Sequence, residues 1–302
     1  MFRTDRIASA FARMVPSILD ALEAADAFRY AETQDKLATI GAGVDRIAVS
    51  PSDPDDIPND LYIFSRIVDF FRAYNGVWRD IHGGQFAASW TCLQDALDYL
   101  RAIKRFSNDS ASAFDFFESQ VPEIEKLYPY KVFASIGAII GRCECSICGA
   151  DMNGGDCPHL MGELYRGKIA HDIVTSIEGL DHTALVTDPA DKRCVVQIED
   201  NDERFRVVRY LSGLLTQGVL SPLHFRRAES SKRRTVNPDY REQPRNALCR
   251  CGSGRKHKKC CLSKKYFEDH VEIVYSHRSY SWRPIGGGIR QSDANESMDR
   301  RA

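Results

Sequence analysis

The ten cysteines of this 302-residue chain constrain its fold most strongly, because eight of them lie in two short clusters. The clusters are C-E-C-S-I-C-G-A-D-M-N-G-G-D-C-P-H at residues 143–159 and C-R-C-G-S-G-R-K-H-K-K-C-C at residues 249–261. Arg3, Asp5 and Arg6 interrupt any signal-peptide-like apolar stretch, and no run of about 18 apolar residues is present. We therefore predict a cytoplasmic protein with no membrane contact, in which the clustered thiols bind metal rather than form disulfides.

The first cluster has the spacing of a four-ligand zinc site. Cys145 and Cys148 form a C-x-x-C pair, and Cys157 and His159 follow as a C-x-H pair. Zn²⁺ in structural sites takes four nitrogen or sulfur ligands in a tetrahedron. Such a closed site leaves no open position for catalysis, so we predict a structural zinc. Cys143 is a fifth thiol that could replace one of the four ligands.

The second cluster contains four thiols within thirteen residues. Sulfur atoms bound to one zinc at ~2.3 Å lie ~3.8 Å apart, close to the spacing of neighbouring Cα atoms, so adjacent cysteines can both be ligands. Cys260 and Cys261 would complete an all-sulfur site with Cys249 and Cys251. The segment is too short for a core of its own, so the metal would supply its folding free energy. The two clusters together predict two Zn²⁺ ions per chain.

The stretch N-A-L-C-R-C-G-S-G-R-K-H-K-K-C-C-L resembles the SEC-C motif, a small zinc-binding module found at the C-terminus of the preprotein translocase ATPase SecA and on many other bacterial proteins. The resemblance covers about residues 244–262 and implies that the four cysteines are zinc ligands. His257 stands where the family often has an aromatic residue. In SecA the module binds the chaperone SecB and ribosomes, so the resemblance implies docking rather than catalysis.

The rest of the chain resembles uncharacterised bacterial proteins in which Y-P-Y, S-I-G and C-S-I-C-G precede a terminal SEC-C module. That likeness implies an architecture and no activity. We predict an α+β fold with an N-terminal helical domain, a small zinc-containing β-rich middle domain and a C-terminal SEC-C zinc module.

Residues 1–130 are predicted to form the helical domain. Apolar side chains recur at helical spacing in residues 61–78 and 89–106. Residues 50–60 are rich in proline and aspartate and predict a loop, and a Gly-Gly pair separates the two helices. Cys92 lies in the second helix, where it is expected to be a small buried side chain.

Residues 131–220 are predicted to form the α+β domain that holds the first zinc site. A strand is expected at residues 131–140, and a hairpin at residues 182–199 around the turn D-P-A-D. Cys194 lies in this hairpin and is expected to be buried. A helix is expected at residues 202–217, ended by a glycine cap. The strands should share a core in which the first zinc site is embedded.

The net charge of −1 conceals an asymmetry along the chain. Residues 221–265 carry 14 Lys and Arg against three acidic residues, whereas the remainder carries 27 basic and 39 acidic residues. We interpret residues 221–243 as a basic linker, residues 244–263 as the SEC-C module and residues 264–302 as a partly disordered tail. Such a basic segment favours a polyanion or an acidic protein surface as partner, and the alternative is a solvated linker. The residues expected to contact the partner are Arg226, Arg227, Lys232, Arg233, Arg234, Arg255, Lys256, Lys258 and Lys259.

Three classes of function remain open. The leading one is a zinc-stabilised, non-enzymatic docking protein whose basic arm binds RNA, DNA or a ribonucleoprotein, because phosphate contacts need little more than clustered cations. The second is an adaptor that docks on an acidic protein surface, as the SecA resemblance implies. The third is a hydrolase-type enzyme in the β region, with His171, Asp172, Asp181 and His182 as candidates. No motif surrounds these four residues, so a structural role is the simpler interpretation for them.

Overall fold

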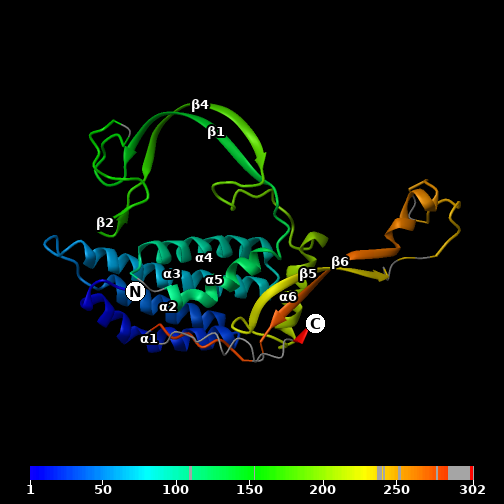
Figure 1. Ribbon diagram of the computed structural model, residues 1–302, viewed down its shortest axis with the longest axis horizontal. Coiled ribbons are helices and arrows are strands. Elements are labelled where there is room, and N and C mark those ends of the chain that lie inside the picture. Colours follow the sequence, from blue (N-terminus) through cyan, green and yellow to red (C-terminus); the bar gives the residue numbers. More distant parts are fainter. Residues whose placement is uncertain are drawn as a thin grey trace.

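The computed structural model shows a helical body from which two long β-ribbons extend, each with a small knob at its end (Figure 1). The predicted α+β class, with a helical N-terminal part and two cysteine clusters after it, is confirmed. We call residues 145–171 the first knob and residues 240–265 the second knob. The structure describes residues 1–108, 111–152, 154–236, 240, 242–250, 253–276, 278–284 and 300–301.

The body is built from helices whose apolar faces meet in one core. The helices are α1 (Asp5–Asp26), α2 (Tyr30–Asp45), α3 (Asp56–His82), α4 (Phe86–Phe106), α5 (Ala111–Glu125) and α6 (Arg206–Thr216).

Helices α3 and α4 contain the two predicted helical segments, which are therefore confirmed. The predicted loop at residues 50–60 is shorter than expected, because α3 already begins at Asp56. Pro58 lies in the first turn of α3, where a missing N–H costs no helical hydrogen bond. The helix expected at residues 202–217 is confirmed by η1 (Glu203–Phe205) and α6, and Gly218 follows with the left-handed φ of 66° that its capping role requires.

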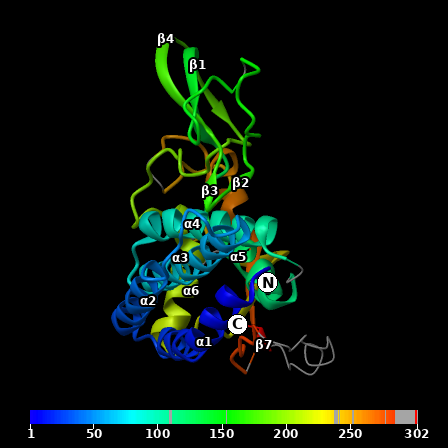
Figure 2. The same cartoon turned by 90° about the vertical axis from the view of Figure 1, so that its left-hand side faces the viewer.

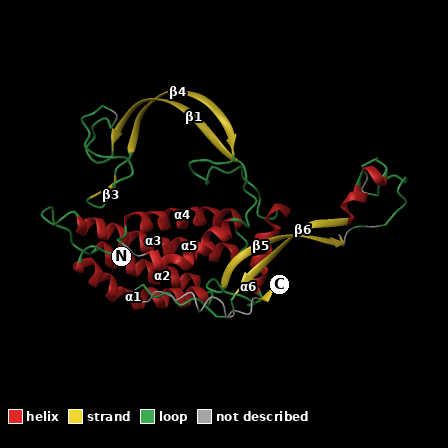
Figure 3. Cartoon of the chain, in the orientation of Figure 1, coloured by secondary structure: helices red, strands yellow, loops and turns green. Residues whose placement is uncertain are grey.

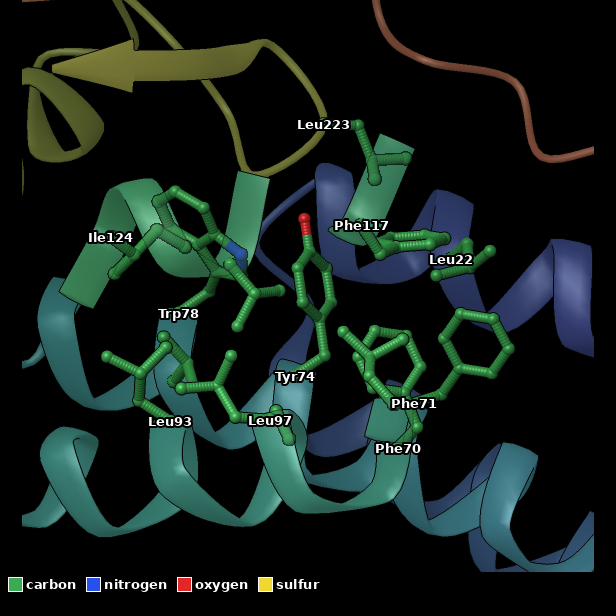
Figure 4. Packing of buried hydrophobic residues seen from close by; sticks show 14 of the residues in the cluster. Leu22, Phe70, Phe71, Tyr74, Trp78, Leu93, Leu97, Phe117, Ile124 and Leu223 are labelled. Carbon is green, nitrogen blue, oxygen red and sulfur yellow. The ribbon is translucent and has the colours of Figure 1, made fainter. Parts of the chain in front are cut away.

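Aromatic side chains fill the centre of the body (Figure 4). Tyr74 of α3 packs edge-on against Phe117 of α5 and against Trp78, and all three side chains are buried. The Tyr74 hydroxyl donates a hydrogen bond of 2.7 Å to Oε1 of Gln120, so its polar atom is satisfied inside the core. Cys92 of α4 is half-buried, and burial raises the pKa of its thiol to about 11.

The chain returns to this core near its end. Trp282 is only 2% exposed, its ring centroid lies 4.9 Å from that of Phe71, and its Nε1 donates to the Ala113 carbonyl at 2.8 Å. The interpretation of residues 264–302 as a partly disordered tail did not foresee this contact. His277, residues 285–299 and Ala302 lie outside the described residues.

The first ribbon pairs β1 (Phe133–Cys145) antiparallel with β4 (Asp172–Val186). The hairpin predicted at residues 182–199 is wrong, because residues 182–186 pair with β1 instead. Cys194 is exposed beside an isolated bridge and not buried in a strand. Alternation of apolar residues predicts a strand but does not specify which strand it pairs with. Here residues 182–186 pair with residues 133–137, about 50 positions earlier in the sequence.

The expectation that these strands share a core is also wrong. Among the residues of β1 and β4, only Phe133 and Cys145 are buried, one at each end of β1. The ribbon rises from the body and curves as an arch, so its knob comes back over the N-terminal end of α3 (Figures 1 and 2). The first cluster therefore lies at the end of an arch, outside the hydrophobic core.

Polar contacts hold the first knob to the body. The knob contains β2 (Leu164–Tyr165) and β3 (Lys168–Ile169), joined by a tight turn. In that turn Arg166 forms an ion pair with Asp55, and the Gly167 N–H donates to Oδ1 of Asn59 at 2.8 Å. Gly167 has a φ of 80°, and a Cβ there would lie 2.9 Å from the Pro58 carbonyl oxygen, so only glycine fits.

The second ribbon pairs β5 (Phe225–Val236) antiparallel with β6 (Tyr266–Tyr275), and β7 (Arg300–Arg301) pairs with the end of β6. The interpretation of residues 221–243 as a linker is wrong for the twelve residues of β5. The sequence F-R-R-A-E-S-S-K-R-R-T-V has polar residues on both faces and so lacks the period of two that predicts a strand.

The second knob projects from the far end of this ribbon, away from the helices (Figure 1). Two short 3-10 helices, η2 (His257–Lys259) and η3 (Cys261–Lys265), form part of it (Figure 3). The two cysteine clusters thus lie on separate ribbons.

Candidate metal centres

The first knob brings together the four residues predicted from the first cluster. Cys145 ends β1, and its carbonyl accepts a hydrogen bond of 2.8 Å from the N–H of Gly149, which closes a tight turn around Cys148. Gly149 has a φ of 75°, the left-handed conformation that this turn requires. Cys157 and His159 then approach from the loop that precedes β2.

The distances between these side chains fit one tetrahedral metal. The Sγ atoms of Cys148 and Cys157 are 3.6 Å apart, and Nδ1 of His159 lies 3.7 Å from the Sγ atoms of both Cys145 and Cys157. All four ligand atoms lie within 4.8 Å of one another. Ligands at ~2.0–2.3 Å from a shared zinc are separated by about 3.5–3.8 Å, so the group can hold such an ion.

Cys143 does not belong to this ligand group. It lies two residues before Cys145 in β1, opposite Val174, and is absent from the set of close ligand atoms found among the described residues. Burial raises the pKa of its thiol. The alternative in which Cys143 replaces one of the four ligands has no support in this geometry.

The sulfur atoms of the first centre have different environments. Burial raises the pKa of the Cys157 thiol to about 11. Burial acts in the same direction on Cys145, but the backbone N–H groups of Cys148 and Ile147 point at its sulfur and bring its pKa below the usual value. Backbone N–H groups directed at sulfur are the outer-shell contacts expected around a thiolate that binds metal.

Tyr165 is a contributor to this centre that the sequence did not reveal. Its ring packs edge-on against the His159 imidazole at 4.7 Å, and its hydroxyl accepts a hydrogen bond of 2.9 Å from the Leu160 N–H. It therefore orients His159 from β2. The surrounding stretch G-E-L-Y-R-G-K contains no pattern that predicts a contact with a metal ligand.

The second knob brings together three of the four predicted sulfur ligands. Cys249 is buried, and the Sγ atoms of Cys260 and Cys261 are 3.7 Å apart, as expected for adjacent cysteines on one zinc. The ligand atoms of all three lie within 4.8 Å of one another. Cys251, the fourth predicted ligand, lies outside the described residues.

Backbone pairing explains how Cys249 reaches the other two. Its N–H donates to the Arg255 carbonyl at 2.7 Å, and Leu248 forms an isolated bridge with Lys256. Gly254 has a φ of 68°, which lets the chain reverse between them. Gly254 therefore allows the return of the chain from Cys249 toward Cys260 and Cys261.

His257 is the second residue whose role the sequence did not predict. It is 2% exposed, with Nδ1 3.8 Å from the Cys249 sulfur and Nε2 3.0 Å from the Tyr240 hydroxyl. Among the described residues, the ligand atoms that lie within 4.8 Å of one another belong to Cys249, Cys260 and Cys261, and His257 is not in this group. A donor that contacts a metal-binding sulfur and is itself held by a further hydrogen bond is an outer-shell residue.

The predicted partner-binding cations separate into two groups. Arg255, Lys256, Lys258 and Lys259 are exposed on the second knob and, within the described part of the chain, form no ion pair. Two further cations of the knob, Arg245 and Arg250, share these properties.

The cations at the base of the second ribbon have partners inside the chain. The Arg226 guanidinium donates to the carbonyls of Leu223 and Phe225 and lies over the Phe116 ring at 4.9 Å. Arg227 pairs with Glu229. The side chains of Lys232, Arg233 and Arg234 lie outside the described part of the structure, although the backbone register places Lys232 opposite Asp269.

The four residues considered for hydrolysis do not converge on a pocket in the described structure. His171 holds the first knob through its backbone, donating to the Ser146 hydroxyl at 3.0 Å. His182 contacts its neighbour Asp181 on the exposed arch, with 2.9 Å between Nδ1 and Oδ2. Two cavities, of about 680 Å³ beside α6 and about 150 Å³ at the start of α3, contain none of the four candidates.

Comparison with known proteins identifies the second knob. Residues 245–263 match the family model described as the SEC-C motif, so the chain contains this motif. No curated protein and no solved structure matches the chain. Among the residues that the structure describes, no helix has the length and apolar character needed to cross a membrane.

Proposed function

We propose that this protein is a zinc-stabilised docking protein whose SEC-C knob binds RNA, DNA or a ribonucleoprotein through phosphate groups. The observation that carries the proposal is the set of six exposed cations on the second knob, none with an ion pair in the described structure. The knob stands at the end of a ribbon, clear of the body (Figure 1), so a large polyanion could reach it. Clustered Lys and Arg side chains without acidic partners provide the counterion release that drives binding to phosphate backbones.

The metal in both centres is proposed to be zinc. The first centre offers three sulfur atoms and one imidazole nitrogen, and the second offers three described sulfur atoms with Cys251 as the proposed fourth ligand. Such compact sulfur-rich sets are typical of structural Zn²⁺ sites. Zinc would hold the chain reversals together, because no described residue of either knob belongs to the hydrophobic core. Thiols that must remain reduced to bind zinc also support the proposed cytoplasmic location.

The cations of the knob set the size of the expected electrostatic effect. Each phosphate neutralised by Lys or Arg contributes a slope of about 0.7–0.9 to the fall of log K with log salt concentration. Reversal of three of the six cations should therefore reduce that slope by roughly 2–3 and weaken binding at least about tenfold near physiological salt.

The test measures binding of labelled single-stranded and duplex RNA and DNA by fluorescence anisotropy over a series of salt concentrations. The variant is Arg255→Glu, Lys256→Glu and Lys258→Glu. The matched control reverses three exposed cations of the body or arch base that also have no described ion pair, Arg13, Arg46 and Lys131. An unchanged slope in the knob variant, or equal loss in the control, contradicts the proposal.

The adaptor function on an acidic protein surface uses the same six cations, and the SEC-C match supports it as the second candidate. The two functions differ in their response to nuclease. Partners recovered from native cell extract by the wild-type knob, and missing with the reversed variant, should disappear after nuclease treatment if the knob docks on nucleic acid. Their persistence would favour the adaptor.

A further inference from the structure

The arch formed by β1 and β4 has one apolar face and one polar face. On the polar face, His182 lies over Gly137, where an added Cβ would come within 2.6 Å of the imidazole ring, and Ser176 and Glu178 lie in the same way over Gly141. On β1 the alternate residues from Ala134 to Ile140 lie on the opposite face, whereas Ile139, opposite Gly179, lies on the same face as the two glycines. The apolar face consists of the directly opposed pairs Ala134 and Leu185, Ile136 and Thr183, Ala138 and Leu180, and Ile140 and Ile177.

No described part of the chain covers this apolar face. Ile136, Leu180 and Leu185 are 67%, 75% and 71% exposed, and Ile140 and Ile177 are also exposed. An antiparallel sheet with one polar and one apolar face normally packs the apolar face against a core. A two-stranded ribbon without such packing is marginally stable in water. The face therefore has the character of an interface that a single chain leaves open.

Side-chain sizes along the face alternate in a way that fits a second copy of the same face. The first three pairs each join a large side chain with a small one, and the large one comes from β4 in Leu185, from β1 in Ile136 and from β4 again in Leu180. Their partners Ala134, Thr183 and Ala138 leave shallow positions beside them. When two such faces meet, large side chains of one can occupy the small positions of the other, as in well-packed protein layers.

We propose that the apolar face of the arch is a homodimer interface, in which two copies pack face to face about a two-fold axis. None of the eight side chains on the face is charged, so bringing two identical faces together places no like charges opposite each other. If each of the five large side chains on either copy buries roughly 100 Å², the dimer covers on the order of 1,000 Å². That area is at the lower limit of specific interfaces and corresponds to a reversible dimer, with a dissociation constant on the order of 1–100 µM.

Sedimentation velocity of the full-length, zinc-loaded protein between about 1 and 200 µM tests the proposal. Wild type should pass from monomer to dimer over this range, and raising the salt concentration should not dissociate the dimer, because the face is uncharged. The variant Ile136→Asp with Leu180→Asp should stay monomeric at concentrations at least tenfold above the wild-type midpoint. The matched control places the same charges on the polar face, Ser135→Asp with Ser176→Asp, and should dimerise like wild type.

A second variant keeps the result interpretable if the double aspartate variant does not fold. Thr183→Asp changes a side chain that is already polar and exposed, in a position expected to receive a large side chain of the other copy. It should weaken the dimer several-fold while leaving the far-UV spectrum and melting temperature unchanged. The proposal is overturned if wild type remains monomeric throughout, if the apolar-face variants dimerise normally, or if high salt dissociates the dimer, since the last result would indicate association through the charged knobs.

Discussion

The two β-ribbons have similar topology and opposite surroundings. Each is a long antiparallel pair with a cysteine cluster at its end, but the first curves back so that its knob touches the body, whereas the second extends freely (Figure 1). The first has an uncharged apolar face. The second ends in six exposed cations without described ion pairs. The same arrangement, a ribbon that ends in a cysteine cluster, thus carries an exposed apolar face in one case and an exposed basic knob in the other.

The attachment of each ribbon also differs. Within the described residues, the second ribbon is attached to the body at its base, where Phe225, Ile273 and Tyr275 are buried in the core and the Gln120 amide donates to the Phe225 carbonyl. The arch is attached at its base through Phe133 and at its knob through Arg166 and Gly167. Both bases are held by buried side chains, and polar contacts at the knob give the first ribbon a second attachment. The four experiments below test this difference, from the largest expected effect to the smallest.

The largest effect is expected for Trp282→Ala, which removes a buried ring from the segment that follows β6. The ring contacts Phe71 and Phe11, and its Nε1 bonds the Ala113 carbonyl. Loss of a buried tryptophan should lower the free energy of unfolding by about 3–5 kcal/mol, measured by urea denaturation followed by circular dichroism. Val196→Ala, at a side chain 57% exposed near the base of the arch, is the control and should cost less than about 1 kcal/mol. Equal losses would mean that the core does not include the C-terminal segment.

The next effect separates the two metal centres. Cys249→Ser with Cys260→Ser should unfold the second knob and weaken nucleic-acid binding by roughly 100-fold, because a small metal module has no other source of stability. The helical body should melt within about 2 °C of wild type, since no residue of this knob belongs to its core.

The matched variant in the first centre is Cys145→Ser with Cys148→Ser. Because the first knob lies outside the hydrophobic core, this variant should also leave the melting temperature of the body nearly unchanged, and it should retain nucleic-acid binding. Differential scanning calorimetry and anisotropy measure both properties. Collapse of the whole protein would show that the first metal stabilises the body, as the sequence alone had suggested.

A smaller effect is expected when one tyrosine of each knob is replaced by phenylalanine, in two separate variants. Tyr240→Phe removes the hydroxyl that holds His257, which contacts the Cys249 sulfur, and should speed zinc release to a chelator about tenfold. Tyr165→Phe keeps the ring against His159 and loses only the bond from Leu160, so release from the first knob should change less than threefold. Zinc release is followed with a colorimetric chelator. Similar rates for the two variants would argue against an outer-shell role for His257.

The smallest effect is expected for Gly167→Ala at the contact between the first knob and the body. The left-handed φ and the short approach to the Pro58 carbonyl make any Cβ unfavourable there. The substitution should cost about 1–2 kcal/mol locally and increase hydrogen exchange in residues 50–59 without changing exchange in the second knob. Gly213→Ala is the control, because an added Cβ meets no atom within 4 Å. Unchanged exchange in residues 50–59 would mean that the arch is not held at its knob.

Local patterns in the sequence were sufficient to predict the two groups of candidate metal ligands and three of the helices. Cysteine and histidine spacing predicted the four residues that meet in the first knob and the three described cysteines that meet in the second, because ligands of one metal must lie close together and short loops keep them so. Helical periodicity identified α3, α4 and α6, since each buries one continuous stripe of side chains. The SEC-C motif was likewise carried by a short, contiguous stretch.

Long-range pairing could not be read from those patterns. The sequence did not indicate that β4 pairs with β1, that the polar residues of β5 form a strand, or that Trp282 packs into the core. Each of these features depends on contacts between residues that are far apart in the chain. Strand alternation and composition do not indicate which distant segment a strand or side chain will contact. The amino-acid sequence by itself determined which residues form the two candidate metal centres and where α3, α4 and α6 lie. Only the tertiary structure decided that the two centres stand on separate ribbons, one beside the body and one away from it, because that arrangement follows from strand register and core packing.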